Sequence, residues 1–72
     1  MPTVFVYWRE GRSQAARDKV AKAIAEAFGA IPEARASRDE VDVTFYEVPP
    51  GRTYHAGERL APIVPQSDAR DG

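Results

Sequence analysis

The sequence contains no cysteine, only one histidine and no long hydrophobic run. Without cysteine the chain can form neither a disulfide nor a thiolate metal site. One histidine is too few for a zinc site, which needs about three protein ligands or more. No apolar stretch approaches the roughly 20 residues that cross a bilayer, and the basic and apolar segments of a secretory signal are missing. We therefore expect a cytoplasmic protein without a metal or another cofactor.

An excess of charge of one sign is also missing. Ten basic residues against eleven acidic residues give a formal net charge of −1. Proteins that bind nucleic acids or anionic membranes usually present a clear basic surface, so we expect neither partner.

The chain has 72 residues, of which 43% are hydrophobic and 29% are charged, a composition typical of one small globular domain. A core of this size rarely contributes more than about 3–5 kcal/mol of stability. Because disulfides and zinc are excluded, we expect partner subunits to supply the remaining stability.

The hydrophobic pattern predicts two strands separated by a helix. Residues 3–8 are almost continuously β-branched or aromatic, which is typical of a strand covered on both faces. Residues 14–28 are rich in alanine, lysine and glutamate, with Ser13 as the predicted N-cap and Gly29 as the predicted C-terminal stop. Residues 41–48 begin with alternating apolar and polar side chains, which predicts the second strand.

This order predicts an α/β (α+β) protomer built on a parallel, right-handed βαβ unit. One helix covers a single face of a two-stranded sheet, so we expect the other face to contact another subunit. We interpret residues 52–60 as a hairpin and residues 60–65 as an extended, proline-interrupted arm. The predicted organisation is one domain over residues 2–65 and a flexible C-terminal tail over residues 66–72.

Pro2 is the first candidate functional residue. A small second residue usually permits removal of the initiator methionine, which leaves Pro2 with a free secondary amine. The reference pKa of an α-amino group is about 7.7–8.0. Apolar burial or a nearby cation lowers an amine pKa toward the range in which a general base works best. The alternative is that proline stands here by chance.

Two arginines and a histidine are the other candidates. Arg9 and Arg12 flank Gly11 in the predicted turn after the first strand, and guanidinium groups bind carboxylates in a bidentate manner. The alternative is two solvated surface arginines. His55, beside Tyr54, is able to exchange protons near neutral pH, although a lone loop histidine is more often incidental. The sequence contains no dinucleotide-binding, phosphate-loop or nucleophile-elbow motif.

Together these features resemble the 4-oxalocrotonate tautomerase family of the tautomerase superfamily. The resemblance covers about residues 2–60 and rests on Met1-Pro2, on Glu10-Gly11-Arg12-Ser13 and on Gly57-Glu58-Arg59-Leu60. It implies βαβ protomers whose sheets pair and assemble into a hexamer, a trimer of dimers. It also implies that Pro2 is the general base or acid and that Arg12 binds a substrate carboxylate.

The chain differs from the best-known short tautomerases at two positions. Asp42 stands where they carry a second arginine, and Tyr54 lies one place from their pocket aromatic residue. Arg9 with Arg12 instead resembles one subunit type of trans-3-chloroacrylic acid dehalogenase, a hetero-oligomer of the same superfamily. A glutamate activates water in that enzyme, and His55 lies near its position.

We therefore predict a keto–enol tautomerase that acts on a small unsaturated or 2-oxo carboxylate. Pro2 and His55 are the candidate catalytic residues, and Arg9, Arg12 and Tyr54 are the candidate substrate-binding residues. The alternatives are hydration or dehalogenation of a 3-substituted acrylate and a non-catalytic partner subunit. We expect a homo-hexamer, with a hetero-oligomer left open.

Overall fold

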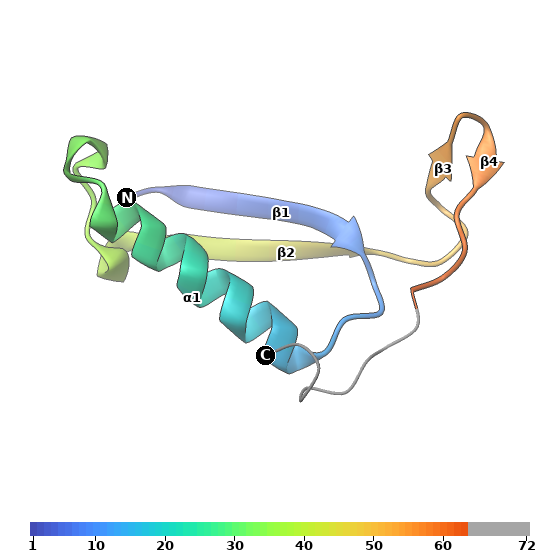
Figure 1. Cartoon of the computed structure of the whole chain (residues 1–72), viewed down its shortest axis with the longest axis horizontal. Coiled ribbons are helices and arrows are strands. Elements are labelled where there is room, and N and C mark those ends of the chain that lie inside the picture. The colour runs from blue at the N-terminus through green and yellow to red at the C-terminus, as the bar shows by residue number, and fades with distance from the viewer. Residues whose placement is uncertain (64–72) are drawn as a thin grey trace.

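The computed structural model describes residues 1–63, so the predicted tail and the last two residues of the predicted domain lie outside the described residues. Residues 1–63 form two longer strands, one helix, two 3₁₀ turns and a small hairpin (Figure 1). In chain order these are β1 (Thr3–Arg9), α1 (Gln14–Ala30), the 3₁₀ turns Pro32–Ala34 and Arg38–Glu40, β2 (Asp42–Val48), β3 (Tyr54–His55) and β4 (Glu58–Arg59).

The two longer strands form a parallel sheet, and the helix lies against one of its faces (Figure 1). The register runs from Thr3 opposite Asp42 to Arg9 opposite Val48. The predicted βαβ unit is therefore confirmed. β2 begins one residue later than expected because the N–H of Val41 donates to the carbonyl of Arg38 and closes the preceding turn.

Helix α1 begins as predicted but ends later. The hydroxyl of Ser13 accepts a hydrogen bond from the N–H of Ala16 at 3.0 Å, which confirms the N-cap. The predicted stop at Gly29 is wrong, because the helix continues to Ala30 and Pro32 follows its C-cap. A Cβ at position 29 would lie 3.2 Å from the backbone nitrogen of Arg38. Glycine at position 29 therefore allows the helix to pack closely against the second 3₁₀ turn. The local sequence does not reveal this contact.

The two faces of the sheet differ sharply in exposure. On the helix side, Trp8 packs against Phe45 with ring centroids 4.9 Å apart. The opposite side carries Phe5, Tyr7 and Tyr46, which are 54%, 71% and 45% exposed and which we call the aromatic face. The rings of Tyr7 and Tyr46 stack at 4.8 Å. Residues 1–63 thus cover only one face of the sheet.

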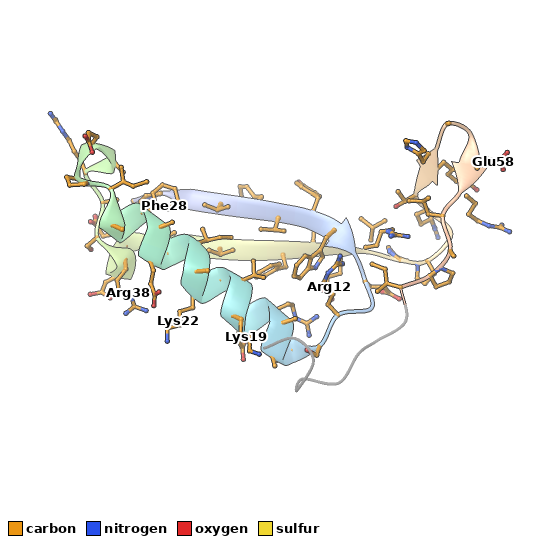
Figure 2. All side chains as sticks on the ribbon, viewed as in Figure 1. Arg12, Lys19, Lys22, Phe28, Arg38 and Glu58 are labelled. Carbon is orange, nitrogen blue, oxygen red and sulfur yellow. The ribbon has the colours of Figure 1, made fainter. Side chains whose placement is uncertain are left out.

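The outer side of the helix is polar. Lys19 and Lys22 are exposed and point away from the sheet (Figure 2). No hydrophobic side chain among residues 1–63 is fully buried. The protomer described here therefore lacks a closed core of its own.

The expected hairpin is present. β3 pairs with β4 in antiparallel fashion, and Ala56 and Gly57 form the turn with positive φ angles of 52° and 82°. Two adjacent residues with positive φ are typical of the tight turns that suit the twist of a hairpin. The hairpin stands beyond the C-terminal end of β2, away from the helix (Figure 1).

After β4 the chain returns to the turn between β1 and α1. We call residues 61–63 the return segment. The guanidinium of Arg9 donates to the carbonyl of Ala61 at 2.8 Å. Gly11 has a φ of 129°, and a Cβ there would lie 2.7 Å from the carbonyl oxygen of Ile63. Both the backbone conformation and the close approach therefore require glycine at position 11.

Candidate active site

The candidate residues lie at two ends of the sheet. Pro2 immediately precedes β1, whereas Arg9 is its last residue and Arg12 follows in the next turn. An extended strand rises about 3.3 Å per residue, so Pro2 and Arg9 are roughly 23 Å apart along β1. Within one chain, the structure does not bring Pro2 together with either arginine.

At the first end, Pro2 is half-buried and tied to the start of β2. Its carbonyl accepts a hydrogen bond from the N–H of Asp42 at 3.1 Å. The carboxylate of Glu40 lies nearby. The pKa of Glu40 is lowered chiefly by hydrogen bonds from the backbone and hydroxyl of Ser37, and further by the positive charge at the chain terminus. One carboxylate, that of Glu40, thus interacts with the charge at the terminus that would carry the Pro2 amine.

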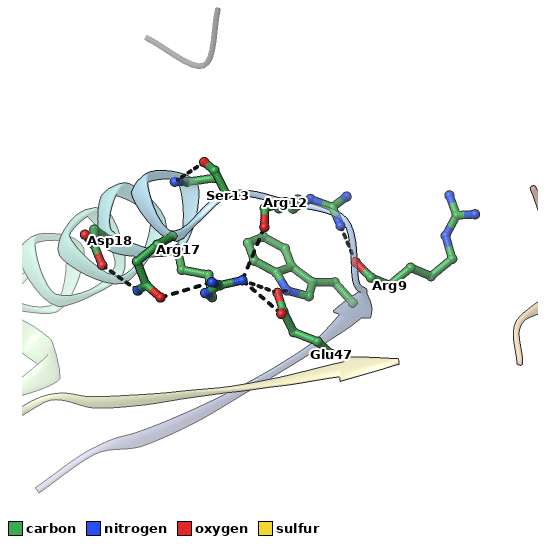
Figure 3. A network of polar contacts seen from close by, with 9 residues as sticks. Arg9, Arg12, Ser13, Arg17, Asp18 and Glu47 are labelled. Atoms are coloured by element: carbon green, nitrogen blue, oxygen red, sulfur yellow. Dashed lines mark hydrogen bonds and ion pairs between the residues drawn. The ribbon is translucent and has the colours of Figure 1, made fainter. Parts of the chain in front are cut away.

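At the second end, Arg9 ends β1, Arg12 lies in the turn that follows, and the two side chains bind different partners. Arg12 donates to the carbonyl of Arg9 at 2.8 Å, and the guanidinium of Arg9 is bound to the return segment. Figure 3 shows the two guanidinium groups apart, with Arg9 extended away from the turn. Arg9, predicted in the turn, is instead the last residue of β1, and the charged groups of the two arginines do not form a single fork in one chain.

Arg12 also lies over an aromatic ring. Its guanidinium carbon is 4.4 Å from the centroid of the Trp8 ring, a cation–π distance. The indole N–H of Trp8 donates to a carboxylate oxygen of Glu47 at 2.8 Å. Arg17 forms an ion pair with the same carboxylate at 2.8 Å (Figure 3). We call these four residues the Glu47 cluster.

The cluster keeps Glu47 ionised. The hydrogen bond from the Trp8 indole, followed by the hydrogen bond and charge of Arg17, lowers the pKa of Glu47 below its usual value of 4.5. A lowered pKa in the folded state means that the cluster contributes its full stabilisation above about pH 4.5. That contribution is lost as the pH falls through the lower pKa of the folded state.

Sequence reasoning missed Glu47 and Arg17. Trp8 was predicted only as part of the first strand, and neither Glu47 nor Arg17 was selected. The available signal was a glutamate in a strand whose alternation places it on the helix side. Because Trp8 and Glu47 are register partners across the parallel sheet, the contact becomes visible once the register is known.

Tyr54 and His55 lie on the hairpin, far from Pro2 in the same chain. Both are exposed, Tyr54 by 58%, and His55 is the register partner of Glu58. A shallow hollow between the hairpin and β1 is lined by Arg9, Thr53, Leu60 and other residues, but not by Tyr54 or His55. The structure therefore does not bring Tyr54 and His55 together with Pro2 in one chain, and neither residue lines the hollow beside Arg9.

The described part of the chain has neither the side-chain groups of a metal site nor a membrane-spanning helix. No group of three or more histidine, cysteine or acidic side chains among residues 1–63 is arranged to hold a metal ion. Within the same residues, no helix has both the length and the apolar character needed to cross a membrane.

The architecture thus defines the class of the protein: a small βαβ protomer with one open sheet face. No protein-family model matches the chain, and a comparison with curated proteins found no match. Among solved structures, the chain is similar to the crystal structure of N2, described as a member of the 4-oxalocrotonate tautomerase family. The TM-score is 0.70 at 24% sequence identity, over 88% of this chain and 95% of that chain. This similarity shows that the two proteins share their fold, which confirms the predicted fold class.

Proposed function

We propose that the protein belongs to the 4-oxalocrotonate tautomerase family and catalyses keto–enol tautomerisation of a small unsaturated or 2-oxo carboxylate. The main support is the position of Pro2 directly before β1 in a fold shared with a member of that family. Arg12 supports a carboxylate substrate. Within residues 1–63, only one of its three guanidinium nitrogens has a hydrogen-bond partner, so the other two are free to bind a carboxylate.

In the proposed mechanism, removal of Met1 exposes the amine of Pro2. The neutral amine accepts a proton from a substrate carbon or enol oxygen and returns it at another atom. Arg12 binds the carboxylate and stabilises the negative charge that develops on the enolate. Because Pro2 and Arg12 lie near opposite ends of β1, one site must combine Pro2 of one chain with Arg12 of another.

The first prediction concerns this assembly. We expect sedimentation equilibrium to give a mass several times the 7.9 kDa of one chain, with a homo-hexamer as the proposed form. The physical reason is the aromatic face, which a single chain leaves in water. A stable, fully active monomer would contradict both the assembly and the shared site.

The reaction itself is tested by two assays on the same purified protein, one with a phenylenol-type enol and one with a 3-haloacrylate. Ketonisation of the enol without halide release supports the tautomerase. Activity on neither substrate, together with full activity after a second chain is added, supports a non-catalytic partner subunit in a hetero-oligomer.

A second candidate function is hydration or hydrolytic dehalogenation of a 3-substituted acrylate. The observation that favours it is the carboxylate of Glu40 beside the chain terminus, because nearby negative charge favours a protonated amine. Protonated Pro2 would then donate its proton to carbon while His55 orients the attacking water. Activity that needs protonated Pro2 falls as the pH rises, whereas activity that needs neutral Pro2 rises.

The second prediction uses His55 to separate these reactions. Tautomerisation needs one proton carrier and a carboxylate-binding group, so His55→Ala is expected to keep tautomerase kcat/KM within about threefold of wild type. Water addition needs a second group that orients water, so the same change is expected to abolish any halide release. Steady-state kinetics on both substrates provide the measurement. Loss of tautomerase activity in a correctly assembled His55→Ala protein would show that His55 takes part in proton transfer.

A further inference from the structure

The guanidinium of Arg12 is held in a defined position before any substrate arrives. One terminal nitrogen donates to the carbonyl of Arg9 at 2.8 Å, and the planar group lies 4.4 Å from the centre of the Trp8 ring. A long arginine side chain on an exposed turn would otherwise sample many rotamers, and ordering it upon binding would reduce affinity. The position of the Trp8 ring therefore helps to determine whether the guanidinium of Arg12 is already oriented to bind a carboxylate.

Glu47 fixes the Trp8 ring from the neighbouring strand. The two residues are register partners across β1 and β2, and one carboxylate oxygen accepts the indole N–H at 2.8 Å. Arg17, in the first turn of α1, binds the two carboxylate oxygens at 2.9 Å and 2.8 Å. Glu47 is therefore anchored at both oxygens, with its side chain 27% exposed.

Arg17 also connects the cluster to the backbone of the turn. Its guanidinium donates to the carbonyl of Arg12 at 3.3 Å and to the side-chain oxygen of Gln14 at 3.0 Å (Figure 3). The carboxylate of Glu47 is thus engaged by the indole and by Arg17, with no hydrogen bond to the guanidinium of Arg12 among the described residues. The charge of Arg12 still interacts with Glu47 through space, but its guanidinium keeps nitrogens that can bind an incoming anion.

We propose that Glu47 is a positioning residue for substrate binding, which holds Trp8 beneath Arg12 so that the guanidinium presents its free edge to a carboxylate. This role rests on the proposed function, because it assigns Arg12 to the substrate carboxylate. Glu47 acts through Trp8 and does not itself contact the substrate.

The test compares Glu47→Ala with Glu47→Gln. Alanine removes the acceptor of the indole N–H, whereas glutamine keeps an acceptor oxygen. We expect Glu47→Ala to raise KM at least tenfold with kcat within about threefold of wild type, and Glu47→Gln to recover most of that increase. Glu26→Gln removes a carboxylate from an exposed helix position and serves as the matched control, with wild-type KM and kcat.

A second variant keeps the proposal testable even if Glu47→Ala fails to fold. Trp8→Phe keeps an aromatic ring and the Glu47–Arg17 ion pair but removes the N–H that links the ring to Glu47. We expect it to raise KM as Glu47→Ala does. In the double variant the KM increase should not exceed that of either single change, since both break the same link.

The chain has one tryptophan, so its fluorescence reports on this cluster alone. We expect Glu47→Ala to increase acrylamide quenching of Trp8 emission about twofold, while Glu26→Gln leaves it unchanged. Wild-type KM in either folded variant, Glu47→Ala or Trp8→Phe, or unchanged quenching in folded Glu47→Ala, would overturn the positioning role. If wild-type protein turns over no carboxylate substrate, the proposed function itself fails, which is a different result.

Discussion

Blocking the nitrogen of Pro2 is expected to lower kcat by at least about 100-fold, because positioned proton transfer contributes about 10²- to 10⁴-fold to a reaction of this kind. The nitrogen of Pro2 carries a basic lone pair only after Met1 is removed, since in the chain with Met1 it is an amide nitrogen. Intact-mass measurement should show a mature chain that starts at Pro2. Activity should then fall in proportion to any fraction that retains Met1.

Two changes at the terminus sharpen this test. Pro2→Ala keeps an amine in place, as a primary amine, so partial activity is expected. Insertion of one serine before Pro2 leaves an amine at the new terminus but moves it along the strand direction by roughly one residue rise, about 3.3 Å. That variant should be inactive although its fold and assembly are unchanged. Full activity in a protein shown by mass to retain Met1 would exclude Pro2 as the proton carrier.

Arg12→Ala is expected to lower kcat/KM at least tenfold on every substrate that the protein turns over. Truncating one partner of a desolvated, charge-assisted pair costs about 2–5 kcal/mol, and less where water reaches the pair. Arg12→Lys should recover only part of the loss, because an ammonium keeps the charge but not the planar, bidentate donor. Arg52→Ala removes an exposed arginine beyond β2 and should leave kcat/KM near wild type.

Mixing two inactive proteins tests the shared site directly. In one protein the Pro2 nitrogen is blocked, and in the other Arg12 is replaced by alanine. Each protein therefore lacks one of the two groups that every site needs. After unfolding and refolding together, mixed oligomers should contain some sites with an intact Pro2 and an intact Arg12, and part of the activity should return. Complete absence of recovery in proven mixed oligomers would contradict the assignment of these two residues to different chains.

The sequence was sufficient to predict most of the fold because its signals are local. A β-branched and aromatic run predicted β1, Ser13 predicted the start of α1, and the alternation of apolar and polar residues predicted β2. Gly29 was wrongly assigned as a helix stop. Its role depends on Arg38, which packs against it from a later turn, and a contact of that kind leaves no local pattern.

The sequence suggested candidate residues for the site but not how they are arranged. Pro2, Arg9 and Arg12 were selected from their chemistry and from a family resemblance. Two features of this arrangement are tertiary contacts. Arg9 binds the carbonyl of Ala61, which lies 52 positions later in the sequence, and Trp8 binds Glu47, which lies 39 positions later. Such contacts depend on strand register and on the path of the return segment, which composition and periodicity do not encode.

The missing closed core has a consequence for how the protein must be handled. If a second chain covers the aromatic face, as proposed, folding and association are one reaction, and protein concentration enters its equilibrium. Dilution then acts as a denaturant: it separates the chains, disassembles the sites and exposes the aromatic residues in a single step. A thermal midpoint measured at one concentration describes only that concentration. Specific activity measured at low enzyme concentration will underestimate the activity of the assembled protein.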